Sequence, residues 1–504
     1  MHALIDNRPA PACPAPFNVA QYVLSAGFAT PDKIALQVLS VTRAERWSFA
    51  ALTAAVRGVG TGLLALGLTP GDRVLLRLDN TVDFPLAFLG ALAAGLVPVP
   101  TSSQLTTPEI TGMAGQISPA LIIAAPGVAL PDHPAPVTDA AQLKTWRNLP
   151  PCDWHLGDPN RLGYLIFTSG TSGRPRAVMH AHRAVWARRM MWDDWYGLTS
   201  GDRLLHAGAF NWTYTLGTGL LDPWAKGATA LIPASGTDPA QLPLLLKRFD
   251  ATIFAAAPGI YRQLLKSPLP PMPRLRHGLS AGEKLPAATR EAWHTSTGIP
   301  VFEALGMSEV STYVSQGPNR PSTPDGSGHP QTGRCIAVLG PDNTPVARGE
   351  AGEMAVSADD PGLFLGYWGQ DAETRARFSG AWFKTGDTVL MAPDGAIRFL
   401  GRDDDMMNAG GYRVSPMEVE ASFDGCAGIT ECAAVELPVR AGVSVVALFY
   451  VAGTPAPTED ALAAHAQAKL ARYKQPRLFV AMDSLPKSAN NKLNRTSLRQ
   501  TWKG

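Results

Sequence analysis

Residues 168–176 read Thr168-Ser169-Gly170-Thr171-Ser172-Gly173-Arg174-Pro175-Arg176, and they directly follow an apolar run, Gly163-Tyr164-Leu165-Ile166-Phe167, that predicts a buried strand. Glycines let backbone N–H groups approach an anion closely, hydroxyls add hydrogen-bond donors, and arginine adds a charged planar fork. A loop with these parts is suited to holding a polyphosphate, although it lacks the Gly-x-x-x-x-Gly-Lys-Ser/Thr frame of a Walker A loop. By composition alone, a polar surface loop after a strand would be the favoured interpretation.

Length and composition are those of an ordinary globular protein. The chain has 504 residues, enough for one to four domains, and it contains 45% hydrophobic and 17% charged residues. The net charge of +2 gives no electrostatic reason to expect nucleic acid or a membrane as the main partner. The cysteines show no CxxC or paired His/Cys frame, so we expect reduced thiols in a cytoplasmic protein. They are Cys13, Cys152, Cys335, Cys426 and Cys432.

No segment is expected to insert into a membrane. Residues 1–8 lack a basic stretch followed by an apolar core, which argues against a signal peptide. The longest apolar run, 84–100, is interrupted by prolines and glycines, whereas a membrane span needs about 20 predominantly apolar residues. We interpret this run as a buried helix that passes into a buried strand over 96–100.

Short apolar runs alternate with longer segments of helical pattern. Such runs lie at 73–78, 121–124, 228–232 and 252–255. This alternation predicts α/β architecture with largely parallel sheets.

The pattern changes near residue 400. Residues 388–391 and 396–400 flank Pro393-Asp394-Gly395 and predict a β-hairpin, because Asp-Gly suits the turn. A charged break follows at 401–405, and we place a domain boundary there, between residues 1–401 and 402–504. The alternative is a long loop inside one domain.

Beyond the break, the sequence predicts a compact α+β unit. Ser415-Pro416-Met417-Glu418 has the serine cap, the proline and the glutamate that begin a helix. Strands are expected at 432–439 and 445–451, and a second helix is expected over 459–473, before Pro476.

Taken in order, these motifs resemble those of the adenylate-forming superfamily, which comprises acyl- and aryl-CoA synthetases, adenylation domains of peptide synthetases and firefly-type luciferases. The resemblance spans the chain from Pro31 to Lys492 and is closest to benzoate-type CoA ligases. It implies a large N-terminal domain of parallel-rich α/β sheets with a β-barrel-like part, followed by a small mobile α+β C-terminal domain.

The resemblance implies a site for ATP and Mg²⁺. The phosphate loop would hold the β- and γ-phosphates through Thr168, Ser169, Gly170, Thr171, Ser172 and Gly173. Arg176 stands where the family usually has lysine, and it keeps the charge although its geometry differs. Within Ala304-Leu305-Gly306-Met307-Ser308-Glu309, Leu305 replaces the aromatic residue that packs on adenine, as benzoate-type ligases often do. Gly306 and Ser308 would border the nucleotide, and Glu309 and Thr168 would hold Mg²⁺.

The remaining motifs imply the ribose site, the hinge and the catalytic lysine. Asp387, in Thr385-Gly386-Asp387, and Arg402 would bind the ribose hydroxyls. Asp404 would be the hinge of the small domain. Lys492 ends a segment that resembles Pro-Lys-x-x-x-Gly-Lys, with Asn491 at the usual glycine, and it would be catalytic together with Arg176 and Glu309.

The same resemblance implies sites for CoA and for the acid. CoA would contact a loop of Gly410, Gly411, Tyr412 and Arg413; nearby, Asn408 replaces a frequent lysine and receives no role. The acid pocket would be drawn from Phe210, Trp212, Tyr214, Ala257, Ala281, Gly282 and Glu283. Aromatic walls suit a flat or compact apolar acid, whereas Trp212 and Tyr214 could equally be core packing residues.

These assignments predict an AMP-forming carboxylate–CoA ligase that uses ATP, Mg²⁺ and CoA. It would activate an aromatic or compact aliphatic acid as an acyl-adenylate and then transfer the acyl group to CoA. The nearest alternative is a free-standing adenylation enzyme that loads the phosphopantetheine of a carrier protein. A luciferase-like oxygenase and a non-enzymatic nucleotide-binding regulator are further alternatives, and substitutions such as Arg176 and Asn491 give the regulator some weight.

Partners beyond the small carboxylic acid are hypotheses drawn from the resemblance. They are a lysine acetyltransferase acting on Lys492 and a second copy of the chain in a homodimer. A metal site at His180 and His182 is not expected, because no third ligand lies nearby, and we interpret both as helix residues after the phosphate loop.

Overall fold

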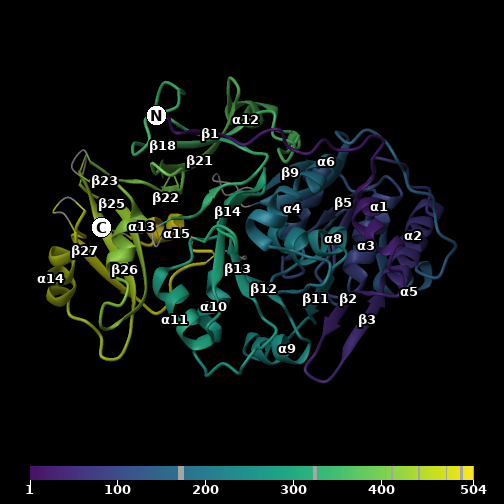
Figure 1. The fold of residues 1–504 in the computed structure, drawn as a ribbon, viewed down its shortest axis with the longest axis horizontal. Coiled ribbons are helices and arrows are strands. Elements are labelled where there is room, and N and C mark those ends of the chain that lie inside the picture. Colours follow the sequence, from purple (N-terminus) through teal and green to yellow (C-terminus); the bar gives the residue numbers. More distant parts are fainter. Residues whose placement is uncertain are drawn as a thin grey trace.

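The computed structural model describes residues 1–168, 175–321, 326–402, 405–409, 412–440, 443–470, 472, 474–487 and 492–502. Figure 1 shows a large N-terminal α/β part at one side and the C-terminal segments, in yellow and light green, gathered at the other. An antiparallel sheet lies along one edge between them. This is the predicted arrangement of a large N-terminal domain and a smaller C-terminal one.

The central element is a nine-stranded mixed sheet. Its five inner pairings, from β2 to β14, are all parallel, and only the edge strands β3, β15 and β16 pair antiparallel. The strands in spatial order are His329–Pro330 (β16), Ser311–Ser315 (β15), Val301–Met307 (β14), His277–Ala281 (β13), Ile253–Ala256 (β12), Arg203–His206 (β10), Thr229–Pro233 (β11), Ile34–Leu39 (β2) and Ala44–Ser48 (β3). Because parallel strands end at the same edge, the segments after β10, β12, β13 and β14 are brought together there.

A second, four-stranded sheet is entirely parallel, as the alternation of apolar runs predicts. Its order is Val97–Pro100 (β5), Arg73–Arg77 (β4), Leu121–Ala124 (β6) and Val137–Asp139 (β7). The apolar run 84–100 forms a helix and then a strand, as predicted; the helix is Asp83–Ala93 (α3). Other helices of this part include Val19–Leu24 (α1), Phe49–Ala65 (α2), Thr107–Ile117 (α4), Ala140–Trp146 (α5), Leu242–Arg248 (α9), Pro258–Leu264 (α10) and Ala287–Thr297 (α11).

The phosphate-loop region lies on a small three-stranded sheet. It consists of Gly366–Tyr367 (β19), Arg176–Ala181 (β9) and Leu162–Thr168 (β8), with β9 antiparallel to both neighbours. His180 therefore lies on a strand, where its ring stacks on Tyr164 with centroids 4.6 Å apart, and only His182 begins a helix, His182–Ala187 (α6). The helical interpretation of His180 is wrong because β8 recruits residues 176–181 as a partner strand.

The part predicted to be barrel-like is a six-stranded antiparallel sheet. It contains Leu4–Asp6 (β1), Cys335–Leu339 (β17), Ala351–Ser357 (β18), Phe378–Ser379 (β20), Trp382–Met391 (β21) and Ile397–Arg402 (β22), and Asp371–Ala376 (α12) precedes β20. The predicted hairpin around Asp394-Gly395 is the pair β21–β22. This pairing places Asp387 opposite Arg402.

The C-terminal part has its own core. The strands are Met407–Ala409 (β23), Tyr412–Val414 (β24), Ile429–Arg440 (β25), Val443–Ala452 (β26) and Leu478–Met482 (β27), and the helices are Pro416–Ser422 (α13), Glu459–Lys469 (α14) and Arg495–Thr501 (α15). Ser415 caps α13 as predicted, accepting from the Glu418 N–H at 3.3 Å. Helix α14 ends four residues before the predicted end, because Leu470 adopts an extended conformation.

One ion pair between α10 and β25 joins the two domains. Glu431 of β25 pairs with Arg262 of α10 at 3.6 Å and with Lys487 at 3.0 Å. The domain boundary at residues 401–402 remains a prediction. Among the described residues, no helix is long and apolar enough to span a bilayer.

Candidate active site

The phosphate loop itself, Ser169, Gly170, Thr171, Ser172 and Gly173, lies outside the described residues. Its two flanking positions are described: Thr168 ends β8 and pairs directly with Arg176 at the start of β9. The two residues on either side of the loop are therefore held together by one antiparallel pair. Arg176 contacts the Glu373 carboxylate at 3.4 Å, and its guanidinium lies 5.2 Å from the centre of the Tyr367 ring.

Glu309 is brought next to this arginine through Tyr367. The Glu309 side chain is buried, and the Tyr367 hydroxyl donates to its Oε1 at 2.7 Å. The carbonyl of Glu309 accepts from the Phe364 N–H at 2.7 Å, which ties the turn after β14 to the segment before β19. Arg176, Tyr367 and Glu309 thus form one charged corner.

The rest of the Ala304–Glu309 motif lies at the end of β14. Leu305, Gly306 and Ser308 are half-buried. A Cβ on Gly306 would lie 2.4 Å from the Ser311 carbonyl oxygen, so only glycine fits this close turn. The Ser308 hydroxyl lies 3.3 Å from the Thr213 hydroxyl, which comes from the predicted acid-pocket segment.

The two predicted ribose residues are joined. Arg402 Nη1 donates to Asp387 Oδ1 at 3.2 Å, and the Tyr313 hydroxyl donates to Oδ2 at 3.1 Å. Burial raises the pKa of the Asp387 carboxyl, and Arg402 opposes that shift. The result is an oriented carboxylate with cationic support, the arrangement needed to accept hydrogen bonds from a diol.

Lys492 of the C-terminal domain reaches into the same site. Its Nζ lies 5.6 Å from the centre of the Trp212 ring, and a Cβ on Gly282 would lie 3.6 Å from its Cε. Burial lowers the pKa of the Lys492 ammonium, whereas the Glu283 carboxylate raises it. Asp387, Glu309 and Arg402 also act electrostatically on this ammonium. A lysine of the C-terminal domain therefore lies against Trp212 and Gly282 of the N-terminal domain.

The predicted acid-pocket residues divide into two groups. Trp212 and Gly282 adjoin Lys492, and the Glu283 carboxylate interacts electrostatically with the Lys492 ammonium. Phe210 stacks on Phe84 in the core, with ring centroids 4.8 Å apart, and Tyr214 is buried with its hydroxyl on the Leu279 carbonyl at 3.1 Å. Ala281 ends β13, and Ala257 directly precedes α10. Of these three aromatic residues, Trp212 is the one that lies beside Lys492, and the acid pocket itself stays a prediction.

The residues predicted for the hinge and for the CoA loop are not described by the structure at the level of their side chains. Asp404, Gly410 and Gly411 lie outside the described residues, and so do the side chains of Tyr412 and Arg413, whose backbone belongs to β24. The hinge and the CoA contacts remain predictions.

A magnesium role for Glu309 fits the donor set. Mg²⁺ is usually bound by one or two carboxylates together with substrate phosphates rather than by an all-protein cage. Within the described part of the chain, no cluster of three or more His, Cys, Asp or Glu side chains could hold a metal, whereas Glu309 supplies one buried carboxylate beside Arg176.

Comparison with known families decides the class. Residues 26–368 match the family model for the AMP-binding enzyme, and residues 418–492 match that for the AMP-binding enzyme C-terminal domain. The chain belongs to the AMP-binding enzyme family. The predicted adenylate-forming superfamily is confirmed.

Relatives and solved structures extend over the whole chain. The chain is 28% identical to a 3-hydroxybenzoate–CoA ligase of Aromatoleum sp. (strain CIB) over 95% of both chains. It is 29% identical to the benzoate–CoA ligase of Thauera aromatica over 95% of this chain and 92% of that one. A crystal structure of an anthranilate CoA ligase in complex with anthranoyl-AMP superposes with a TM-score of 0.87 at 25% identity, covering 97% of this chain and 98% of that one.

Several residues of the site are not singled out by the sequence motifs. Tyr367 lies 58 residues from its partner Glu309, and Tyr313 lies 74 residues from Asp387. The available signal for Tyr367 was a glycine followed by two aromatic residues at 366–368. The contacts of Tyr313 with Asp387 and of Thr213 with Ser308 join residues far apart in the sequence, and only the three-dimensional structure reveals them.

Proposed function

We propose that this protein is an AMP-forming ligase that joins an aromatic carboxylic acid to CoA. In the first step, the acid carboxylate attacks the α-phosphorus of ATP, a P–O bond to pyrophosphate breaks, and an acyl-adenylate forms. In the second step, the CoA thiolate attacks the acyl carbon and AMP leaves. The sum is acid, ATP and CoA converted to acyl-CoA, AMP and pyrophosphate, with the thiol proton released.

The single observation that carries this proposal is the position of Lys492. This lysine belongs to the C-terminal domain, yet it lies against Trp212 in the N-terminal domain and interacts with Glu283, Asp387 and Glu309. Two anions must meet in the first step, so a cation placed between the acid pocket and the nucleotide site lowers the barrier.

The other residues have matching roles in the proposal. Arg176, beside the phosphate loop, offsets phosphate charge, and Asp387 with Arg402 orients the ribose. Glu309 and Thr168 would hold Mg²⁺, which when bound neutralises phosphate charge. Thr213 supports Ser308 from the acid side.

The second step requires CoA to reach the acyl-adenylate. We propose that the C-terminal domain rotates about Asp404, so that Lys492 withdraws and the loop at 410–413 approaches the site. CoA rather than a carrier protein is the acceptor, because the family relatives reported above are CoA ligases. The Trp212 wall and those relatives favour benzoate-like acids over compact aliphatic ones.

Pyrophosphate release tests the proposal. The protein would be mixed with ATP, Mg²⁺ and acids from acetate to octanoate, benzoate, its hydroxy and amino derivatives, and several amino acids, each with and without CoA. We expect turnover only with CoA and an aromatic acid. Release without CoA dependence would indicate a carrier-protein acceptor, and no release with any acid would contradict the ligase function.

Three further predictions accompany this function. We propose a cytoplasmic location, because all five cysteines are free thiols in the structure. Acetylation of Lys492 would remove the charge on which the first step depends, and mass spectrometry of protein from its native cells would detect it. A homodimer is the third, and sedimentation would test it.

A further inference from the structure

A buried ion pair lies in the N-terminal domain, outside the residues assigned above. Arg188, just after α6, and Asp222 are 2.6 Å apart, and their side chains are only 5% and 2% exposed. Arg188 Nε also donates to both carboxylate oxygens at 3.0 Å. Desolvation makes a buried pair a weak contributor to stability compared with apolar residues of the same volume. The role of this pair is therefore better judged from the other hydrogen bonds that Arg188 makes.

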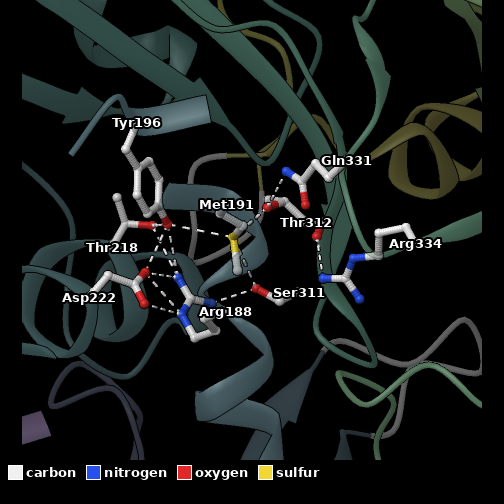
Figure 2. Close-up of polar contacts among 9 residues, drawn as sticks. All are labelled: Arg188, Met191, Tyr196, Thr218, Asp222, Ser311, Thr312, Gln331 and Arg334. Carbon is white, nitrogen blue, oxygen red and sulfur yellow. Dashed lines mark hydrogen bonds and ion pairs between the residues drawn. The ribbon is translucent and has the colours of Figure 1, made fainter. Parts of the chain in front are cut away.

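Arg188 uses its other nitrogens to join segments that are distant in sequence (Figure 2). Nη2 donates to the Tyr196 hydroxyl at 3.1 Å and to Thr218 Oγ1 at 3.4 Å. Nη1 donates to the Ser311 hydroxyl. Gly217 makes room for this packing, since a Cβ there would lie 2.1 Å from the guanidinium carbon.

Ser311 begins β15, two residues after Glu309. Its φ of 72° is in the left-handed region, which is strained for a serine. The next residue is anchored from the opposite side: the Thr312 carbonyl accepts from Arg334 Nη2 at 2.7 Å, and Arg334 pairs with buried Asp360. Figure 2 shows Ser311 and Thr312 between the two arginines. The strained turn that follows Glu309 in the chain is thus held by hydrogen bonds from Arg188 on one side and from Arg334 on the other.

The opposite end of the Arg188 network belongs to the acid side. Asp222 begins α8 (Asp222–Lys226), and Thr218 lies in the helical turn before it, Gly217–Leu221 (η3). This stretch continues directly from α7 (Thr213–Leu216), where Thr213 contacts Ser308. We call residues 210–222 the acid-pocket segment and residues 304–312 the adenylate segment. Two connections link them: the direct contact of Thr213 with Ser308, and the bridge from Asp222 through Arg188 to Ser311.

We propose that Arg188 is a positioning residue that fixes the acid-pocket segment against the adenylate segment and so sets the alignment of the acid carboxylate with the α-phosphate. The inference rests on the proposed function. Misalignment by about 1 Å suffices to slow a reaction about a hundredfold. In the second step the acyl group and AMP are already covalently joined, so that step depends less on this alignment.

The test replaces the pair without leaving a buried charge. In the double variant Arg188→Met/Asp222→Leu both charges are absent and most of the volume remains, so we expect a Tm near that of the unaltered protein. Adenylation, followed as pyrophosphate release, should fall about tenfold or more in kcat. Thioester formation from supplied acyl-adenylate should change by less than about threefold, since it needs no alignment of separate reactants.

A milder variant and a control complete the design. Ser311→Ala removes one link and should lower the kcat of adenylation about fivefold with a modest fall in Tm, even if the double variant fails to fold. The control is Arg276→Met, which breaks the 2.7 Å pair with buried Asp202 away from the site and should lower Tm without separating the two half-reactions.

Equal loss of both half-reactions, or full adenylation activity in Ser311→Ala, would overturn the positioning role. Failure of the ligase function is distinguishable from this result, because the unaltered protein would then release no pyrophosphate with any acid.

Discussion

At the residue scale, the contact between Trp212 and Lys492 can be tested directly by substitution. A cation over an indole face is stabilised by about 0.5–2 kcal/mol. We therefore expect Trp212→Leu to lower the rate of adenylation about two- to thirtyfold, while Trp212→Phe, which keeps a ring, recovers most of it. Pyrophosphate release at saturating acid measures this effect. If the two variants were equally impaired, the ring face would have no role in holding Lys492.

A second residue-scale prediction concerns pH. Burial lowers the pKa of Lys492, so its ammonium loses its proton at a lower pH than an exposed lysine, and adenylation should decline on the alkaline side earlier than is usual. Glu283 raises that pKa. Glu283→Gln should therefore move the alkaline limb of the pH–rate profile to lower pH. A limb that stays in place or moves upward would contradict the assignment of this limb to Lys492.

At the scale of elements, β8 and β9 carry a consequence for acid stability. His180 of β9 stacks on Tyr164, has no hydrogen-bond partner for Nε2 among the described residues, and has its pKa lowered by burial to about 3. The unfolded chain, with histidine near 6.5, binds more protons, so stability present above pH 6.5 is lost as pH falls from about 6.5 toward 3.

We expect His180→Phe to keep the stacking on Tyr164 and to reduce the loss of stability as the pH falls. The free energy of unfolding, measured in denaturant at pH 7 and pH 5, should differ less between the two pH values in the variant than in the unaltered protein. His294→Phe, at an exposed histidine of α11, is a suitable control. An identical pH dependence in His180→Phe would show that the buried ring does not titrate on unfolding.

Elements also show what sequence reasoning can and cannot predict. Local sequence patterns correctly predict the strands at 73–78 and 121–124 and the hairpin at Asp394-Gly395, because these elements depend on residues close together in the chain. His180 was misassigned because its strand exists only through pairing with β8. The link from Arg188 to Ser311 spans 123 residues, and no local pattern encodes it.

At the scale of the whole molecule, the central expectation is a rotation of the C-terminal domain between the two half-reactions. Proline fixes φ near −65° and should restrict a hinge. Asp404→Pro should therefore retain pyrophosphate release and lose thioester formation. Single-turnover assays of both products would measure this, and an unaffected overall rate would remove Asp404 as the hinge.

The most direct test of the central claim is the pair of half-reactions in Lys492→Ala. Removing the ammonium beside Trp212 should abolish adenylation, by about a hundredfold or more, and spare thioester formation from supplied acyl-adenylate and CoA. Lys487→Ala, which removes a nearby lysine paired with Glu431, should leave adenylation largely intact. Equal loss of both half-reactions in Lys492→Ala, or adenylation at the unaltered rate, would contradict the claim that this lysine serves the first step alone.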